Sequence, residues 1–134
     1  MKLSEASRRF LDAPRLAVLG TVNRDGSPHL TVIWYVLRGD EILFNTTAPR
    51  VKPRNLALDP RVSLLVGESA RYVRVDGTAR VVATGAEAVR DIHDLGVRYD
   101  GAEQAERATR ERWSKEERVS YVITIERVYE YGLK

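Results

Sequence analysis

The most regular pattern in the chain is the alternation of apolar and polar residues over positions 72–82. A period of two residues is typical of a β-strand that buries one face. Gly77 interrupts the alternation, and a glycine inside a strand indicates a bulge or a sharp bend. Val73, Val75, Ala79 and Val81 are predicted to share one face of this strand.

Five other short segments are rich in branched apolar residues and are separated by turn signals, which predicts further strands. Asp25-Gly26 is a strong hairpin signal between the first two segments, and Arg38-Gly39-Asp40 makes the next turn. Tight hairpins of this kind imply antiparallel pairing. The five strands are predicted at residues 15–22, 28–37, 41–46, 61–66 and 119–128.

Helical signals occur in four segments between and before these strands. Ser4 is a good N-cap for the first helix, and Pro53 is well placed as the first residue of a short one. The third helix has apolar residues at helical spacing, and the last segment is polar with Trp113 as its large anchor. The predicted ranges are residues 4–13, 53–58, 86–99 and, as a further helix, part of 101–115.

The order of these elements predicts a mainly β protein with flanking α-helices. Many hairpin-connected strands favour a closed antiparallel barrel over a sandwich. Several strands have few purely polar faces, which a barrel interior on one side and a helix or partner subunit on the other would explain. The sequence contains no linker or internal repeat, so residues 1–134 are expected to form one domain.

Composition narrows the classes of function. The chain has no cysteine, which excludes disulfides, thiolate metal sites and cysteine nucleophiles. No stretch approaches the roughly 18 apolar residues of a membrane span, and the N-terminus lacks the apolar region of a secretory signal. A cytoplasmic protein without membrane association is therefore expected. The net charge of +3 is too small to imply nucleic-acid binding by itself.

Residues 45–61 carry the most informative polar cluster, because Arg50, Lys52 and Arg54 alternate at a predicted helix start. Lys52 precedes Pro53 and is expected to be extended. None of the usual cap residues stands directly before Pro53, so an anionic ligand could accept from the first N–H groups of the helix and pair with the cations. The alternative is a solvated basic turn, with Thr46 or Thr47 capping from further back.

Taken together, several motifs resemble the pyridoxamine 5′-phosphate oxidase-like split-barrel superfamily. The resemblance covers most of the chain and rests on the order and spacing of the motifs. They are residues 16–22, Asp25-Gly26-Ser27-Pro28-His29, residues 42–47, Lys52-Pro53-Arg54-Asn55-Leu56, residues 59–66 and Val75-Asp76-Gly77-Thr78-Ala79.

Within this superfamily, the chain looks more like the deazaflavin-dependent branch, which uses coenzyme F420, than the FMN-binding oxidase branch. The oxidases carry a basic pair along the second strand that grips the FMN phosphate. The corresponding residues here are Thr31 and Val36, neither of them cationic. Residues 48–55 instead resemble the segment with which deazaflavin enzymes hold the phosphate and tail. The C-terminal substrate motif of the oxidases is absent from residues 131–134.

The resemblance implies a split β-barrel homodimer with a cofactor site at each side of the subunit interface. By matching position, Thr46 and Thr47 would approach the ring or ribityl chain, and Arg50 and Lys52 would hold the phosphate or acidic tail. The other implied contacts are Arg54 and Asn55 as helpers, His29, Thr31 and Ile33 near the ring, and Tyr72 and Arg74 from the opposite subunit.

The implied function is an F420-dependent oxidoreductase that transfers hydride from the reduced deazaflavin to a small unsaturated or electrophilic substrate. The cofactor carries this chemistry, so no single catalytic residue is assigned. His29 and His93 are too far apart in sequence to form a metal motif, and no metal is expected.

Three alternatives remain open at this stage. The same fold could bind FMN as a flavin reductase or oxidase-like protein, or it could carry F420 without turnover. A third reading is an OB-like barrel that binds single-stranded nucleic acid through basic residues and stacking aromatic rings. The small net charge and the order of the motifs count against that reading. Its residues would be Arg50, Lys52, Arg71, Arg74, Tyr72 and Trp34.

Overall fold

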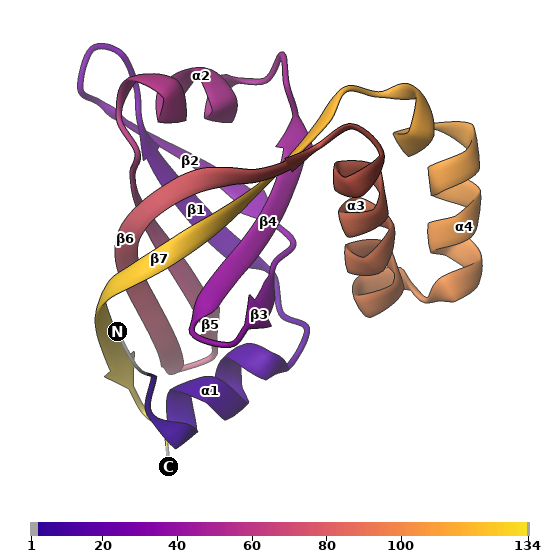
Figure 1. The fold of residues 1–134 in the computed structure, drawn as a ribbon. Coiled ribbons are helices and arrows are strands. Elements are labelled where there is room, and N and C mark those ends of the chain that lie inside the picture. Colours follow the sequence, from indigo (N-terminus) through magenta and orange to yellow (C-terminus); the bar gives the residue numbers. More distant parts are fainter. Residues whose placement is uncertain (1–2, 134) are drawn as a thin grey trace.

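The computed structural model describes residues 3–133 and contains one seven-stranded sheet with the strand order β2-β1-β5-β6-β7-β4-β3 (Figure 1). Every neighbouring pair of strands in it is antiparallel. The strands are β1 (Ala17–Val22), β2 (Pro28–Ile33), β3 (Val36–Arg38), β4 (Glu41–Thr47), β5 (Arg61–Glu68), β6 (Arg71–Thr84) and β7 (Arg118–Tyr131). The helices are α1 (Glu5–Asp12), α2 (Val51–Leu58), α3 (Gly85–Asp100), α4 (Ala102–Glu111) and the 3-10 turn η1 (Trp113–Lys115).

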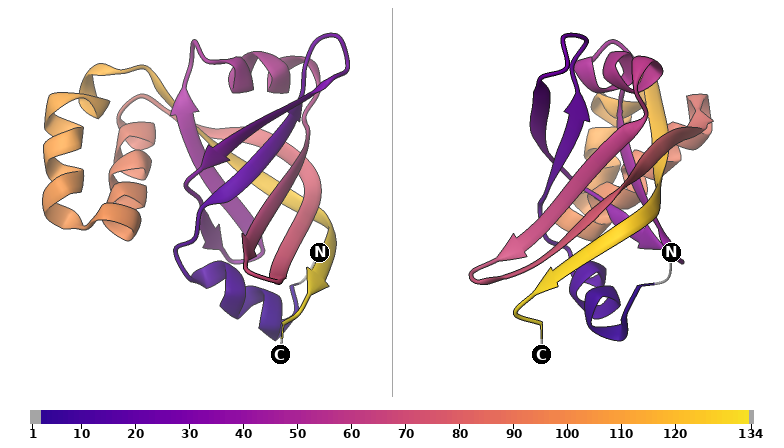
Figure 2. Two further views of the ribbon diagram at one scale, coloured as in Figure 1. Left: turned by 180° about the vertical axis from the view of Figure 1, so that it is seen from behind. Right: turned by 90° about the vertical axis from the view of Figure 1, so that its left-hand side faces the viewer.

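The sheet curls around one core, while β2 and β3 remain as its two edges (Figures 1 and 2). These two strands follow each other in the chain and are not joined in the sheet, so the barrel is split at this point. The predicted antiparallel split β-barrel with flanking helices is therefore confirmed. In Figure 1, α2 covers the upper end of the barrel and α1 the lower end.

The predicted strand over residues 28–37 is wrong in its middle, because the chain leaves the sheet at Trp34 and Tyr35. Tyr35 is fully buried, and its hydroxyl donates to the Leu11 carbonyl at 2.9 Å. The hydroxyl of Tyr99 bonds to the backbone of Tyr35, and the Arg98 guanidinium donates to the Tyr35 carbonyl. Side chains of α3 thus take the place of a neighbouring strand at this break.

Two apolar clusters lie on the two faces of β4, where Ile42 and Phe44 point into the barrel and Leu43 points outward. The larger cluster fills the barrel interior. The smaller one joins Leu43 to α3, α4 and Trp113, which stand beside the barrel as a helical hairpin (Figure 2). This arrangement explains why Leu43 is fully buried although it points out of the barrel. Among residues 3–133, no helix combines the length and the apolar character needed to cross a membrane.

The start of α2 also differs from the prediction. The helix begins at Val51 with Arg50 as its N-cap, so Lys52 is helical rather than extended and Pro53 is the third helical residue. A proline is tolerated there because the first N–H groups of a helix have no partner within it. The N-cap is Arg50 and not a threonine, and its side chain makes no cap hydrogen bond; Thr47 instead accepts from the Arg50 N–H through its backbone carbonyl at 3.2 Å. The end before Asp59 is as predicted.

Most other predicted elements are present with shifted ends. Ser4 caps α1 by accepting from the Ser7 N–H at 3.1 Å. The β6–β7 pairing shifts register between Asp76 and Gly77, which confirms the predicted bulge. The segment after Gly101 forms α4 and η1.

Candidate functional site

A pocket of about 280 Å³ lies where the end of β4, the start of α2 and the start of β7 meet the α3–η1 side of the molecule. Its walls differ in chemistry. One wall is cationic and consists of Arg50, Lys52, Arg112 and Arg118. The other wall is apolar and consists of Leu16, Val32, Ile33, Trp34, Ile92, Leu95 and Trp113. We call this the cationic pocket.

Lys52 is the most unusual residue of the cationic pocket, because it is a cation that is only 6% exposed. Its Nζ donates to the Thr31 hydroxyl at 3.4 Å, and no ion pair within residues 3–133 includes it. Burial, followed by the charges of Arg50 and Arg118, lowers the pKa of Lys52. A desolvated charge without a counter-ion is costly, so this position favours an anion.

Arg118 is the second buried cation of the pocket, at 9% exposure. Its Nε donates to Asn45 Oδ1 at 2.9 Å and its Nη1 to Glu116 Oε1 at 2.7 Å. Burial is the main cause that lowers the pKa of Arg118. The hydrogen bond with Glu116 opposes it, and Arg50 and Arg112 add repulsion. The carboxylate of Glu116 therefore balances only part of the local positive charge.

The structure brings five of the predicted site residues together around the pocket, and a sixth, Thr31, accepts the hydrogen bond from Lys52. Thr46 is buried and Thr47 half-buried at the end of β4, next to the start of α2. His29 shares the inner face of β2 with Thr31 and lies outside the pocket lining. The five that line it are Ile33, Thr46, Thr47, Arg50 and Lys52.

The other predicted residues lie elsewhere. Asn55 is buried, and its amide donates to Thr21 Oγ1 and Asn23 Oδ1, both at 3.0 Å, which ties α2 to β1. Arg54 is exposed on α2. Tyr72 stacks on Tyr131 with ring centroids 5.6 Å apart, close to the β5–β6 hairpin and away from α2.

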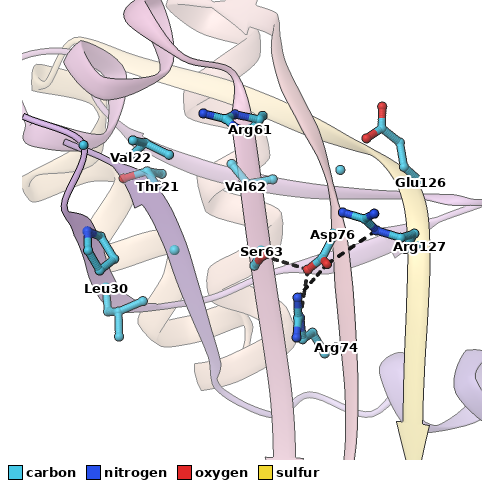
Figure 3. A pocket seen from close by; sticks show the side chains of 14 residues that line it. Thr21, Val22, Leu30, Arg61, Val62, Ser63, Arg74, Asp76, Glu126 and Arg127 are labelled. Atoms are coloured by element: carbon cyan, nitrogen blue, oxygen red, sulfur yellow. Dashed lines mark hydrogen bonds and ion pairs between the residues drawn. The ribbon is translucent and has the colours of Figure 1, made fainter. Parts of the chain in front are cut away.

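A larger pocket of about 480 Å³ lies on the outer face of β1, β2, β5 and β6 (Figure 3). Arg74, the remaining predicted residue, lines it and forms two hydrogen bonds with Asp76, at 2.9 and 2.7 Å. Asp76 also accepts from Ser63 and lies 3.8 Å from Arg127. The bonds from Arg74 are the main cause that lowers the pKa of Asp76. Because its charges are paired internally, this pocket is a weaker anion site than the cationic pocket.

Comparison with known protein families shows to which family the chain belongs. The family model described as pyridoxamine 5′-phosphate oxidase matches residues 3–132. The chain belongs to this family. Its fold is accordingly that of the flavin-binding split barrels, as the sequence motifs indicated.

Solved structures of similar proteins cover nearly the whole chain. The conserved hypothetical protein Rv2991 from Mycobacterium tuberculosis is 31% identical, with a TM-score of 0.79 over 96% of this chain and 84% of that one. A protein described as an F420 reductase is 26% identical, with a TM-score of 0.75 over 95% and 98% of the two chains. The heme storage protein HutZ from Vibrio cholerae, at 19% identity, has a TM-score of 0.74 over 99% and 97% and shares the fold.

Sequence reasoning missed Arg112, Arg118 and Asn45 as pocket residues of this family member. Arg118 reaches the site because β4 and β7 are paired strands, in which Arg118 lies opposite Thr47. Asn45 lies opposite Ser120 in the same pair of strands. The only local signal was a single arginine at the start of an apolar strand. Across the described residues, no group of three histidine, aspartate or glutamate side chains could hold a metal ion.

Proposed function

We propose that this split barrel binds coenzyme F420 in the cationic pocket and acts as an F420-dependent oxidoreductase on a small unsaturated or electrophilic substrate. The observation that carries the proposal is the buried Lys52, which has no ion-pair partner among residues 3–133 and lies beside Arg50 and Arg118. Such a site favours a ligand with an anionic end. The similarity to a protein described as an F420 reductase over almost the full length of both chains supports the same choice.

The two walls of the pocket fit the two parts of a deazaflavin cofactor. Lys52 and Arg50 would hold the phosphate, and the hydroxyls of Thr46 and Thr47 lie beside them at the end of β4. The apolar wall with Trp34 suits a planar ring system, because aromatic side chains supply large flat contact areas. The anionic end and the ring therefore have separate complementary surfaces.

The chemistry that a reduced deazaflavin supplies is hydride transfer to an electron-poor carbon. The contribution of the chain is binding, orientation and exclusion of water. Lys52 and Thr46 would bind and orient the cofactor, and the apolar wall would limit the water around its ring.

We further propose that the site is completed by a second copy of the chain. Leu16 and Val32 line the cationic pocket and yet are 58% and 62% exposed, so the pocket opens onto an apolar surface. On that surface Val32, Val18 and Leu65 lie side by side across β2, β1 and β5. A partner subunit on this face would bury the apolar row and close the pocket. Its Arg74, next to Leu65 in the ladder, would then lie at the interface.

The direct test is titration of the purified protein with F420, followed by the fluorescence of the cofactor. We expect saturable binding at micromolar concentrations and a weaker affinity for the Lys52→Met variant. The loss should be on the order of 1.5–3 kcal/mol, the value of a hydrogen bond to a charged group. Absence of saturable binding would rule out the F420 assignment, and an unchanged affinity in the variant would remove Lys52 from the site.

Two rival functions of the same fold give different results in the same experiments. A protein that purifies yellow with the absorbance of FMN, and that binds FMN more tightly than F420, would be an FMN-dependent flavin reductase or oxidase-like protein. Tight F420 binding without oxidation of the reduced cofactor by any member of an acceptor panel would indicate a carrier.

A further inference from the structure

Arg118 has the features of a ligand-binding residue that is held in place by the protein. A guanidinium has five N–H donors in a rigid planar fork. Asn45 engages the one on Nε and Glu116 engages one on Nη1. The Arg118 side chain is nevertheless part of the pocket wall. Its remaining N–H donors therefore lie at the edge of the pocket, on a guanidinium whose plane the protein has already fixed.

Asn45 is itself fixed by hydrogen bonds that connect it to the helical layer. Its Nδ2 donates to the Ala88 carbonyl and to the Ser120 hydroxyl, both at 2.9 Å. The Ser120 hydroxyl donates to Asp91 Oδ2 at 2.7 Å. With both donors of the amide used in this way, its oxygen must face Arg118. The network therefore sets the orientation of the Arg118 guanidinium.

The two buried cations come from different elements, since Lys52 lies in the first turn of α2 and Arg118 at the start of β7. Burial is the main cause that lowers the pKa of both groups, and the charge of Arg50 repels both of them. Arg112 adds a further positive charge beside Arg118. A single negative charge cannot neutralise this set, because Glu116 is the one carboxylate that pairs with any of these four residues within 3–133.

We propose that Arg118 is a second anion-binding residue of the cationic pocket, positioned by Asn45 and Glu116, and that the pocket takes ligands whose anionic end carries at least two negative charges. A diphosphate has this character, as does a phosphodiester with a neighbouring carboxylate. The inference deepens the proposed function and rests on it for the choice of pocket, but it concerns the charge of the ligand and not the identity of its ring.

The test uses inorganic pyrophosphate and inorganic phosphate as probes, with binding followed by the shift in melting temperature at constant ionic strength. Wild-type protein should be stabilised by pyrophosphate at lower concentrations than by phosphate. In Arg118→Met the affinity for pyrophosphate should fall about tenfold or more, to near that for phosphate, because one charged contact is lost. Arg107→Met, which removes an exposed α4 arginine outside the pocket lining, should behave as wild type.

Two further variants separate ligand contact from a structural role. Arg118→Lys should recover part of the pyrophosphate affinity, since it restores the charge without the planar fork. Asn45→Ala should weaken pyrophosphate binding when Arg118 is present and should have no further effect in the Arg118→Met variant. The two effects should not add, because Asn45 acts on the ligand only through Arg118.

The outcomes distinguish this inference from the proposed function. Pyrophosphate binding that depends on Arg118, in a protein that does not bind F420, would retain the two-charge site and reject the cofactor. F420 binding combined with equal pyrophosphate affinity in wild type and Arg118→Met, with both proteins folded by circular dichroism, would overturn the role of Arg118. Additive effects of Asn45→Ala and Arg118→Met would overturn the positioning role of Asn45.

Discussion

At the scale of single residues, the energetics of Lys52 oppose stability and favour binding. The side chain gives up its hydration, is repelled by Arg50 and Arg118, and gains one long hydrogen bond to Thr31. A charge in this situation lowers the stability of the ligand-free fold, and an anion that binds beside it removes the cost. Function and stability therefore make opposite demands at this position.

We expect Lys52→Met to raise the free energy of unfolding of the ligand-free protein by on the order of 1 kcal/mol, because replacing an uncompensated buried charge by an apolar side chain of similar length is often stabilising. Urea unfolding monitored by circular dichroism measures the change. The effect should also depend on pH. The folded-state pKa of Lys52 lies below the ordinary value of 10.5, so the folded chain releases this proton at a lower pH than the unfolded chain.

As pH rises towards 10.5, the unfolded chain holds more protons at this site and the wild-type fold becomes more stable relative to Lys52→Met. The difference between the two proteins should therefore be largest near neutral pH and shrink in the window just below 10.5. A difference that grows with pH in this window would contradict the argument.

At the scale of elements, Arg98 joins three segments that are distant in the sequence. Its guanidinium donates to the carbonyls of Asp12 at 2.9 Å and of Leu11 and Ala13 at 3.2 Å, which are end groups of α1 without helical partners. It also donates to the Tyr35 carbonyl at 2.9 Å, where the chain leaves the sheet. The last turn of α3 thus holds both α1 and the break between β2 and β3.

Arg98→Met should lower the free energy of unfolding by on the order of 2–3 kcal/mol, since it leaves several carbonyls without their charged donor. Arg107→Met, on the exposed face of α4, should change it by no more than about 0.5 kcal/mol. Chemical denaturation of the two variants in parallel provides the comparison. Equal stabilities would show that the carbonyls around Arg98 find other partners at no cost.

The bulge in β6 is a second element-scale feature, and it requires a glycine. A Cβ at Gly77 would lie 1.9 Å from the Thr124 carbonyl oxygen on β7, which is backbone and has little freedom to move. Gly77→Ala should therefore lower the melting temperature by several degrees or prevent folding. Gly67→Ala on β5 is the matched control, because its Cβ would have 3.6 Å to its nearest neighbours. Similar melting temperatures for the two variants would contradict this account of the bulge.

The elements that the sequence predicted well are those specified by local patterns, such as the alternation in β6 and the Ser4 cap of α1. The strand break at Trp34 and Tyr35 could not be predicted, because both residues favour strands locally and the deciding contacts come from Arg98 and Tyr99. The candidate site shows the same division. Arg50 and Lys52 form a local cluster, whereas Arg118 joins them only through the pairing of β4 with β7.

At the scale of the whole molecule, the two pockets differ in how their charges are balanced. The larger pocket pairs Arg74 and Arg127 with Asp76 inside one chain. In the cationic pocket, Glu116 is the single acidic partner found for the four cations within the described residues. The net charge of +3 gives no indication of this contrast, because acidic and basic residues are nearly equal in number over the chain. The position of unpaired cations, and not the total charge, indicates where an anionic ligand belongs.

The proposed subunit interface leads to a prediction that couples assembly to binding. Leu65 is 42% exposed at the β5 end of the apolar row, and it does not line the cationic pocket. If a second copy covers this row, Leu65→Glu buries a charge at the interface and should convert the dimer to a monomer. F420 affinity should fall with it, because the pocket mouth at Leu16 and Val32 would lose its cover. Sedimentation equilibrium and the fluorescence titration measure the two effects.

Val97→Glu is the control, since Val97 is 38% exposed on α3, outside the apolar row. It should leave both the mass and the affinity of the wild-type protein unchanged. A wild-type protein that is monomeric at micromolar concentration would reject the interface. A monomeric Leu65→Glu variant with full F420 affinity would support the dimer interface at the apolar row. It would contradict the completion of the pocket by a second subunit, because the pocket would then be complete within one chain.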